Sequence, residues 1–162
     1  MAQIYHERKQ YEEAQELYEE SLRVGRTALG NINSEIAMLL NRVGNFYFER
    51  EEFDKALKTY KEGLRVERIV LDRAHPNVIV TVSNIGEIYR QKGCFSRAIK
   101  LYTEVMELQK LRHGACSAEV ASALNVIGLI HEQKGESNLA LKRLQEALVM
   151  RRIVLGGDHL DV

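Results

Sequence analysis

Similar residues recur along this chain at intervals of 42 positions, and no insertion breaks the register. Gly44, Gly86 and Gly128 keep the interval. The same register holds Ala14, Ala56, Ala98 and Ala140, and also Tyr18, Tyr60, Tyr102 and Leu144. Because chance does not hold one offset over four copies, the sequence predicts an array of structural repeats.

Each repeat contains two stretches in which apolar residues recur at helical spacing, with charged residues between them. Residues 35–48 typify the first stretch and residues 53–71 typify the second. Short polar turns, such as residues 50–52, separate the two stretches. The pattern predicts helices over residues 1–9, 11–29, 34–50, 53–72, 76–91, 95–113, 118–134 and 137–155.

The loops between repeats carry signals for the end of one helix and the start of the next. Three glycines are placed to close the preceding helix in a left-handed conformation: Gly30, Gly114 and Gly156. The residues placed to cap the following helix are Asn33, His75, Ser117 and His159. The final "LGGDHLDV" is a fourth copy of this loop, so its His and Asp residues are interpreted as capping residues and not as metal ligands.

Two other helical architectures share features of this pattern. A coiled coil fits because 42 is a multiple of seven, but turns every twenty-odd residues argue against one continuous helix. HEAT and armadillo arrays have similar periods. The stretch "LNRVGNFY" (residues 40–47), followed by a small residue at Ala56 and an aromatic at Tyr60, has the residue spacing of the tetratricopeptide repeat.

The chain resembles tetratricopeptide-repeat (TPR) arrays of the kinesin light chain and nephrocystin-like type. The stretches "ERIVLDRAHPNV" (67–78) and "RRIVLGGDHLDV" (151–162) carry this resemblance. It implies an all-α fold, a right-handed α-α superhelix built from antiparallel helix pairs. We expect one solenoid domain over residues 1–162. Its parts are a partial repeat at 1–33, repeats at 34–75, 76–117 and 118–157, and the start of a further repeat at 158–162.

The resemblance also implies a function, in which first helices line a concave groove that holds an extended partner segment. In the kinesin light chain type, asparagines there form a ladder to the partner backbone. The residues at groove positions are Asn41, Asn45, Phe48, Glu49, Ser83, Glu87, Arg90, Gln91, Asn125, Leu129 and Glu132. Ser83 and Leu129 depart from this pattern, which predicts a weaker or shifted backbone clamp. The mixed charges predict a partner segment of basic and apolar character.

Composition narrows the classes of partner and location. Lys+Arg and Asp+Glu each count 23, so the surplus of positive charge that nucleic acid or an anionic membrane requires is missing. No apolar run approaches the roughly 20 residues of a membrane span. Cys94 and Cys116 fall at opposite ends of one predicted helix, too far apart for a disulfide. Unpaired thiols are typical of the reducing cytoplasm.

The sequence predicts no catalytic residue, metal site or cofactor. The stretch "HEQKG" at 131–135 begins like a zinc-protease helix but lacks the second histidine. The sequence therefore predicts a scaffold or adaptor for protein partners. The alternative is a regulatory or spacer region of a larger enzyme or signalling protein. The incomplete first and last repeats predict a longer array, or end-to-end self-association through uncapped terminal repeats.

Overall fold

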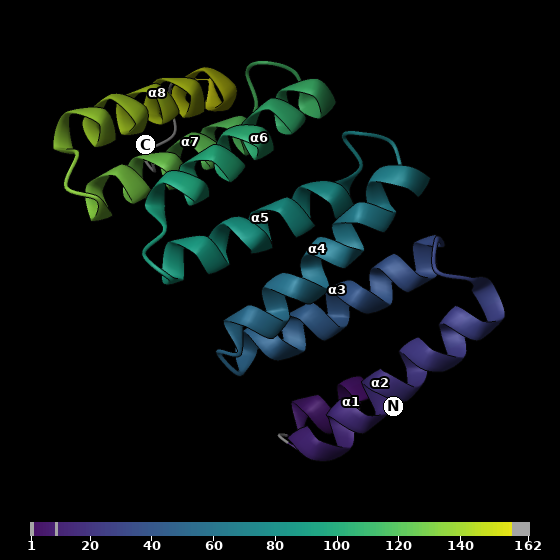
Figure 1. The fold of residues 1–162 in the computed structure, drawn as a ribbon. Coiled ribbons are helices and arrows are strands. Elements are labelled where there is room, and N and C mark those ends of the chain that lie inside the picture. The colour runs from purple at the N-terminus through teal and green to yellow at the C-terminus, as the bar shows by residue number, and fades with distance from the viewer. Residues whose placement is uncertain (1, 9, 157–162) are drawn as a thin grey trace. The chain divides into compact units, whose positions relative to one another are not determined.

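A computed structural model describes residues 2–8 and 10–156, and over these residues it contains α-helices and no strands (Figure 1). The helices are α1 (Ala2–Glu7), α2 (Tyr11–Leu29), α3 (Ser34–Glu49), α4 (Phe53–Val70), α5 (Pro76–Gln91), α6 (Phe95–His113), α7 (Ala118–Gln133) and α8 (Ser137–Leu155). Every predicted helix is present, with each end within two residues of its predicted place. The helical part of the prediction is therefore confirmed.

The contacts between residues divide the chain into two compact units, residues 1–72 and 73–162. The first unit contains α1 to α4 and the second contains α5 to α8. The division falls in the loop that follows α4, within a few residues of the repeat boundary predicted at residue 75. The further repeat expected from residue 158 lies outside the described residues.

In the first unit, the helices of the complete pair, α3 and α4, approach closely at a glycine. A Cβ atom on Gly44 would lie 2.6 Å from the ring of Tyr60, which is 1% exposed. Ala56, one turn before Tyr60, is fully buried. Phe46 is also fully buried, and its ring lies 5.1 Å from that of His6 in α1. Small residues therefore allow the paired helices to approach closely, while aromatic rings fill the space beside them.

The second unit repeats this packing twice. A Cβ atom on Gly86 would lie 3.0 Å from Tyr102, and one on Gly128 would lie 2.8 Å from Leu144. The methionines of the two units differ in burial. Met106 and Met150 pack against the buried cluster of Val120, Leu124 and Ala147. Met38, in the first unit, is 43% exposed, whereas its neighbours Ala37 and Leu40 on α3 are buried.

Three of the predicted N-caps make the expected hydrogen bonds. The Asn33 side chain accepts from the backbone N–H of Glu35, His75 from that of Asn77, and Ser117 from that of Val120. The fourth, His159, lies outside the described residues. The helix-closing glycines all have positive φ, but only Gly156 adopts the left-handed helical conformation. Gly30 and Gly114 combine positive φ with ψ of 175° and 166°, so the chain leaves those helices extended.

The turns inside the helix pairs place one residue in the left-handed region. Gly93 and Gly135 have φ of 69° and 83° in the second unit. The equivalent residue in the first unit is Glu51, with φ of 59°. A side chain at such a φ costs about 1–2 kcal/mol relative to glycine. The turn between α3 and α4 is therefore strained in a way that the other two turns are not.

We expect Glu51→Gly to raise the free energy of unfolding by about 0.5–1 kcal/mol, since it removes this strain at some cost in chain entropy. Urea denaturation followed by circular dichroism measures the change. Glu51→Ala is the matched control, because alanine keeps the unfavourable φ and removes only the charge. Equal stabilisation by both substitutions would contradict the strain.

Candidate functional site

The predicted groove residue Asn41 is engaged inside the first unit. Its Nδ2 donates a hydrogen bond of 2.7 Å to Oε1 of Glu67 in α4. Glu67 is fully buried, and a buried carboxylate needs donors. Gly63 makes room for the amide, because a Cβ atom there would lie 2.9 Å from Oδ1 of Asn41. Asn41 thus supplies a hydrogen-bond donor to a buried carboxyl group of the second helix.

The next predicted position, one turn along each first helix, contacts the second helix of the same pair. Asn45 accepts a hydrogen bond of 2.5 Å from the hydroxyl of Tyr60. Glu87, its equivalent in α5, hydrogen-bonds the hydroxyl of Tyr102. In the third repeat the two positions hold Leu129 and Leu144, so the polar residue and the hydroxyl are both replaced. This change explains why Leu129 departs from the predicted pattern.

Within each unit, a side chain in the last turn of one first helix contacts the first helix that precedes it. In the first unit, Nε2 of His6 lies 3.0 Å from a carboxylate oxygen of Glu49. In the second unit, Arg90 donates a hydrogen bond of 3.2 Å to Gln133. The two pairs are equivalent under the 42-residue repeat, so one type of bridge recurs between successive first helices. Phe48 instead packs its ring against Phe53, with centroids 5.8 Å apart.

Glu87 is the centre of a polar network on α5. Arg90 donates two hydrogen bonds to its carboxylate, of 2.6 and 2.8 Å, and Gln91 donates a third of 2.8 Å. Burial alone would raise the pKa of Glu87, but these donors and the charge of Arg90 hold that pKa below its usual value. Burial, followed by the negative charge of Glu87, raises the pKa of Tyr102 to about 12.

A hollow of about 330 Å³ lies between α5 and α7, with α6 beneath it. Ser83 is the only predicted groove residue in its lining. Ser83 and Ser122 each donate a hydrogen bond to the carbonyl four residues earlier, at 2.9 and 2.8 Å, which leaves their oxygens able to accept. Gln109 of α6 lines the same hollow, and its Oε1 is buried without a hydrogen-bond partner among the described residues.

Sequence reasoning did not find Ser122, Val126 and Gln109. The sequence could have indicated Ser122 and Val126, because each lies three residues, or about one helical turn, before a predicted groove residue, Asn125 or Leu129. Gln109 had no such signal, since it lies on a second helix, and its equivalents Gly25, Glu67 and Arg151 differ in every copy. Of the remaining predicted residues, Asn125 is half-buried, while Leu129 and Glu132 are exposed.

The part of the chain that the structure describes lacks two further kinds of feature. It contains no cluster of three His, Cys, Asp or Glu side chains that could hold a metal ion. None of its helices is long and apolar enough to cross a membrane. The two cysteines, Cys94 and Cys116, are free thiols.

Comparison with known families and structures identifies the repeat. One model of the tetratricopeptide repeat matches residues 35–111, and a second matches residues 1–34 and 120–161. BtubC (BKLC) from P. vanneervenii is 23% identical over 93% of this chain, with a TM-score of 0.80. This chain spans 59% of the length of BtubC. A search of curated proteins gave no significant match.

Two other solved structures are similar. A putative kinesin light chain of Podosopora anserina with nearly identical TPR-like repeats is 15% identical over 94% of this chain and 72% of its own, with a TM-score of 0.81. The N-terminal domain of stress-induced protein-1 (STI-1) from C. elegans is 17% identical over 74% of this chain and 87% of its own, with a TM-score of 0.60. These likenesses confirm the predicted fold class, an all-α solenoid of antiparallel helix pairs.

We expect Asn41→Ala to lower the free energy of unfolding by about 1.5–3 kcal/mol at neutral pH, because the buried carboxylate of Glu67 loses a donor. Denaturant titration measures the change. Asn125→Ala is the matched control, since the residue equivalent to Glu67 in that repeat is the exposed Arg151. A cost for Asn125→Ala equal to that for Asn41→Ala would contradict a special role of the Asn41–Glu67 bond.

Tyr102 gives a prediction at alkaline pH. Its folded pKa of about 12 lies above the ordinary 10.0, so its contribution to stability is complete below about pH 10 and is lost as the pH rises towards 12. Glu87→Gln lowers the pKa of Tyr102, since it removes the adjacent negative charge. The ¹³Cζ resonance of Tyr102 reports its titration. Glu107→Gln on the exposed side of α6 is the control, and an equal shift in both variants would refute the coupling.

Proposed function

The chain belongs to the tetratricopeptide-repeat family, and on that premise we propose that it is a protein-interaction scaffold. In this proposal an extended segment of a partner protein lies against the face formed by the first helices. The scaffold binds its partner and carries out no chemistry of its own. The free thiols of Cys94 and Cys116 agree with action in the reducing cytoplasm.

The hollow between α5 and α7 is the observation that carries the proposal. It is open, lies between two successive first helices and presents hydroxyl and amide groups from Ser83, Ser122 and Gln109. The buried Oε1 of Gln109 is an acceptor that costs about 1–3 kcal/mol when it remains unpaired. A backbone N–H of a bound segment would satisfy it, as the polar groups of peptide-binding grooves do without reading a side chain.

The charges and apolar residues around the hollow favour a basic and apolar segment. Glu119 lines it, and Glu132 is exposed two turns beyond Asn125 on the same helix. Leu129, 43% exposed between them, offers an apolar contact. Arg90 is held by Glu87, so its positive charge is largely neutralised. The asparagines differ in their availability to a partner, because Asn41 and Asn45 already form hydrogen bonds with side chains of α4.

A phage-displayed library of random peptides, panned against the full chain, tests the proposal. We expect enriched peptides that carry Lys or Arg together with apolar residues. Binding of those peptides should be abolished by Ser122→Arg, which fills the hollow and adds a repelling charge. Asn125→Ala should weaken binding about fivefold to tenfold, through the loss of one hydrogen bond to the segment.

Thr103→Arg is the matched control for the hollow. Thr103 is also exposed and also donates its hydroxyl hydrogen bond to the carbonyl four residues earlier, but it lies on the outer side of α6. If Thr103→Arg and Ser122→Arg weaken binding equally, the hollow is not the site. If no peptide is enriched, the alternative of a spacer or regulatory region replaces the scaffold.

A further inference from the structure

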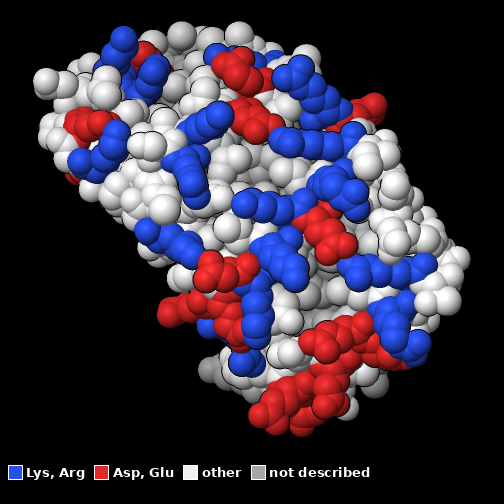
Figure 2. Space-filling view, viewed as in Figure 1, with Lys and Arg blue, Asp and Glu red and all other residues white. Residues whose placement is uncertain are grey.

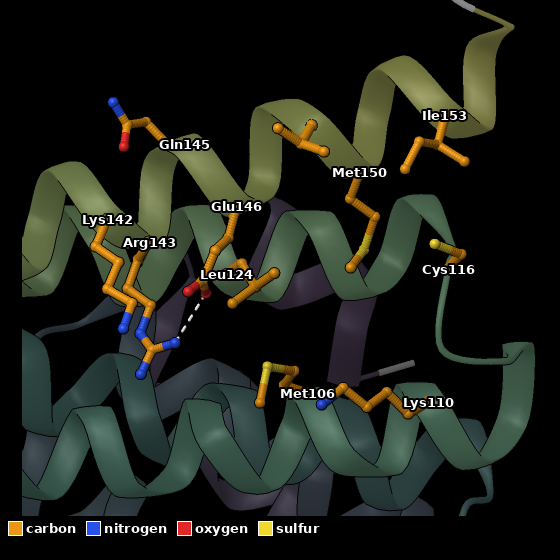
Figure 3. A pocket seen from close by; sticks show the side chains of 11 residues that line it. Met106, Lys110, Cys116, Leu124, Lys142, Arg143, Gln145, Glu146, Met150 and Ile153 are labelled. Carbon is orange, nitrogen blue, oxygen red and sulfur yellow. Dashed lines mark hydrogen bonds and ion pairs between the residues drawn. The ribbon is translucent and has the colours of Figure 1, made fainter.

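A second concave surface lies in the unit of residues 73–162, and second helices form its walls. It is a groove of about 600 Å³ between α6 and α8, and Leu124 of α7 lies at its floor (Figure 3). Both walls pack on α7, whereas α6 and α8 make few direct contacts with each other. The groove shares no lining residue with the hollow between α5 and α7.

The floor and one wall of this α6–α8 groove are apolar. Met106 and Met150 point into the space from opposite walls, above Leu124 (Figure 3). Val149 and Ile153 continue the apolar wall along α8, and they are 55% and 62% exposed. Methionine side chains adapt their shape to a partner, so this surface suits a docked apolar ridge.

Positive charges surround the apolar floor. Lys110, Lys142 and Arg143 line the groove. Lys110 pairs with Glu107 and Arg143 with Glu146, so Lys142 supplies the positive charge that has no ion pair among the described residues. Helix α8 carries four Lys and Arg residues against one Glu, and α6 carries four against two. Figure 2 shows Lys and Arg side chains distributed over the face that carries these two helices.

The equivalent place in the other unit is closed by an ion pair. There Arg26 of α2 reaches across to Glu62 of α4, with N and O atoms 2.7 Å apart. The residues 84 positions later are Lys110 and Glu146, and each pairs within its own helix, Lys110 with Glu107 and Glu146 with Arg143. The bridge that spans the walls in residues 1–72 is thus absent between α6 and α8.

One further substitution distinguishes the two places. The residue equivalent to Val149 in the other unit is Arg65, so a charge stands where the α6–α8 groove has an exposed apolar side chain. The α6–α8 groove has neither the cross-wall ion pair nor the arginine of the other unit. Both differences increase the apolar surface that a partner can bury there. Both differences favour an occupant with an apolar ridge.

We propose that the α6–α8 groove binds an amphipathic helix of a partner protein, with an apolar stripe flanked by Asp and Glu. The wall residues Arg143, Glu146, Met150 and Ile153 follow one face of α8 over eleven residues, or roughly 15 Å. Three turns of a guest helix match that length. The guest would pack on α6, α7 and α8 together, in the manner of a helix bound in an apolar groove.

The probe for this proposal is an acetylated and amidated Ala-rich peptide of about 16 residues, with a Leu stripe at helical spacing and Glu on both sides. The full chain is labelled with ¹³C at its methionine methyl groups. We expect the peptide to shift the Met106 and Met150 resonances and to leave Met38, exposed on α3, unchanged. A twin with Lys in place of Glu should bind at least about tenfold more weakly.

Two variants locate the site. Val149→Arg introduces the residue found at the equivalent position, and it should weaken binding about tenfold or more. Lys142→Glu should weaken it about fivefold or more. Val80→Arg is the matched control, because Val80 is also 55% exposed but lies on α5, outside the groove. Both variants replace exposed residues, so circular dichroism should show an unchanged fold.

The proposal is overturned if the Glu peptide does not bind, if the Lys twin binds equally well, or if Val149→Arg and Val80→Arg have the same effect. It is also overturned if the Met106 and Met150 resonances shift with protein concentration alone and sedimentation shows a dimer. That last result would assign the groove to a second copy of this chain.

Discussion

The close approach of the two helices in each pair is the contact on which the other features depend. Gly44 against Tyr60 and Gly128 against Leu144 leave no space for a Cβ atom, and Gly86 against Tyr102 leaves very little, so the glycines let the two helices of each pair pack closely. At this close approach the tyrosine hydroxyls reach Asn45 and Glu87 on the first helices. These hydrogen bonds connect polar residues of the first helices to the second helix of the same pair.

The sequence predicts the helices well because their determinants are local. Asn33, His75 and Ser117 cap helices within three residues of themselves, and the 42-residue period carries the rest of the pattern. The side-chain contacts on the face formed by the first helices were predicted less completely. The partner of Asn41 is Glu67, 26 positions away on another helix, and that position changes in every copy. A side chain set by a contact unique to one repeat has no periodic signal.

Repeats with the same backbone pattern thus acquire different surfaces through a few side chains. The ion pair of Arg26 and Glu62 closes one place between second helices, while the equivalent Lys110 and Glu146 turn to partners on their own helices. An exposed ion pair contributes little to stability, about 0–1 kcal/mol. Such a pair can therefore be rearranged in one repeat with little loss of folding energy, and its rearrangement uncovers apolar surface.

Helix α7 contributes to both proposed surfaces. Ser122 and Val126 line the hollow towards α5, and Leu124 lies at the floor of the groove between α6 and α8. The two surfaces have opposite charge preferences, because Glu119 borders the hollow whereas Lys110 and Lys142 border the groove. The positive charges of the groove would repel a basic segment, and the negative charge of the hollow would repel an acidic helix. Charge would therefore direct each partner to its own side of α7. If both bind, α7 contacts two partners at once, one through Ser122 and Val126 and the other through Leu124.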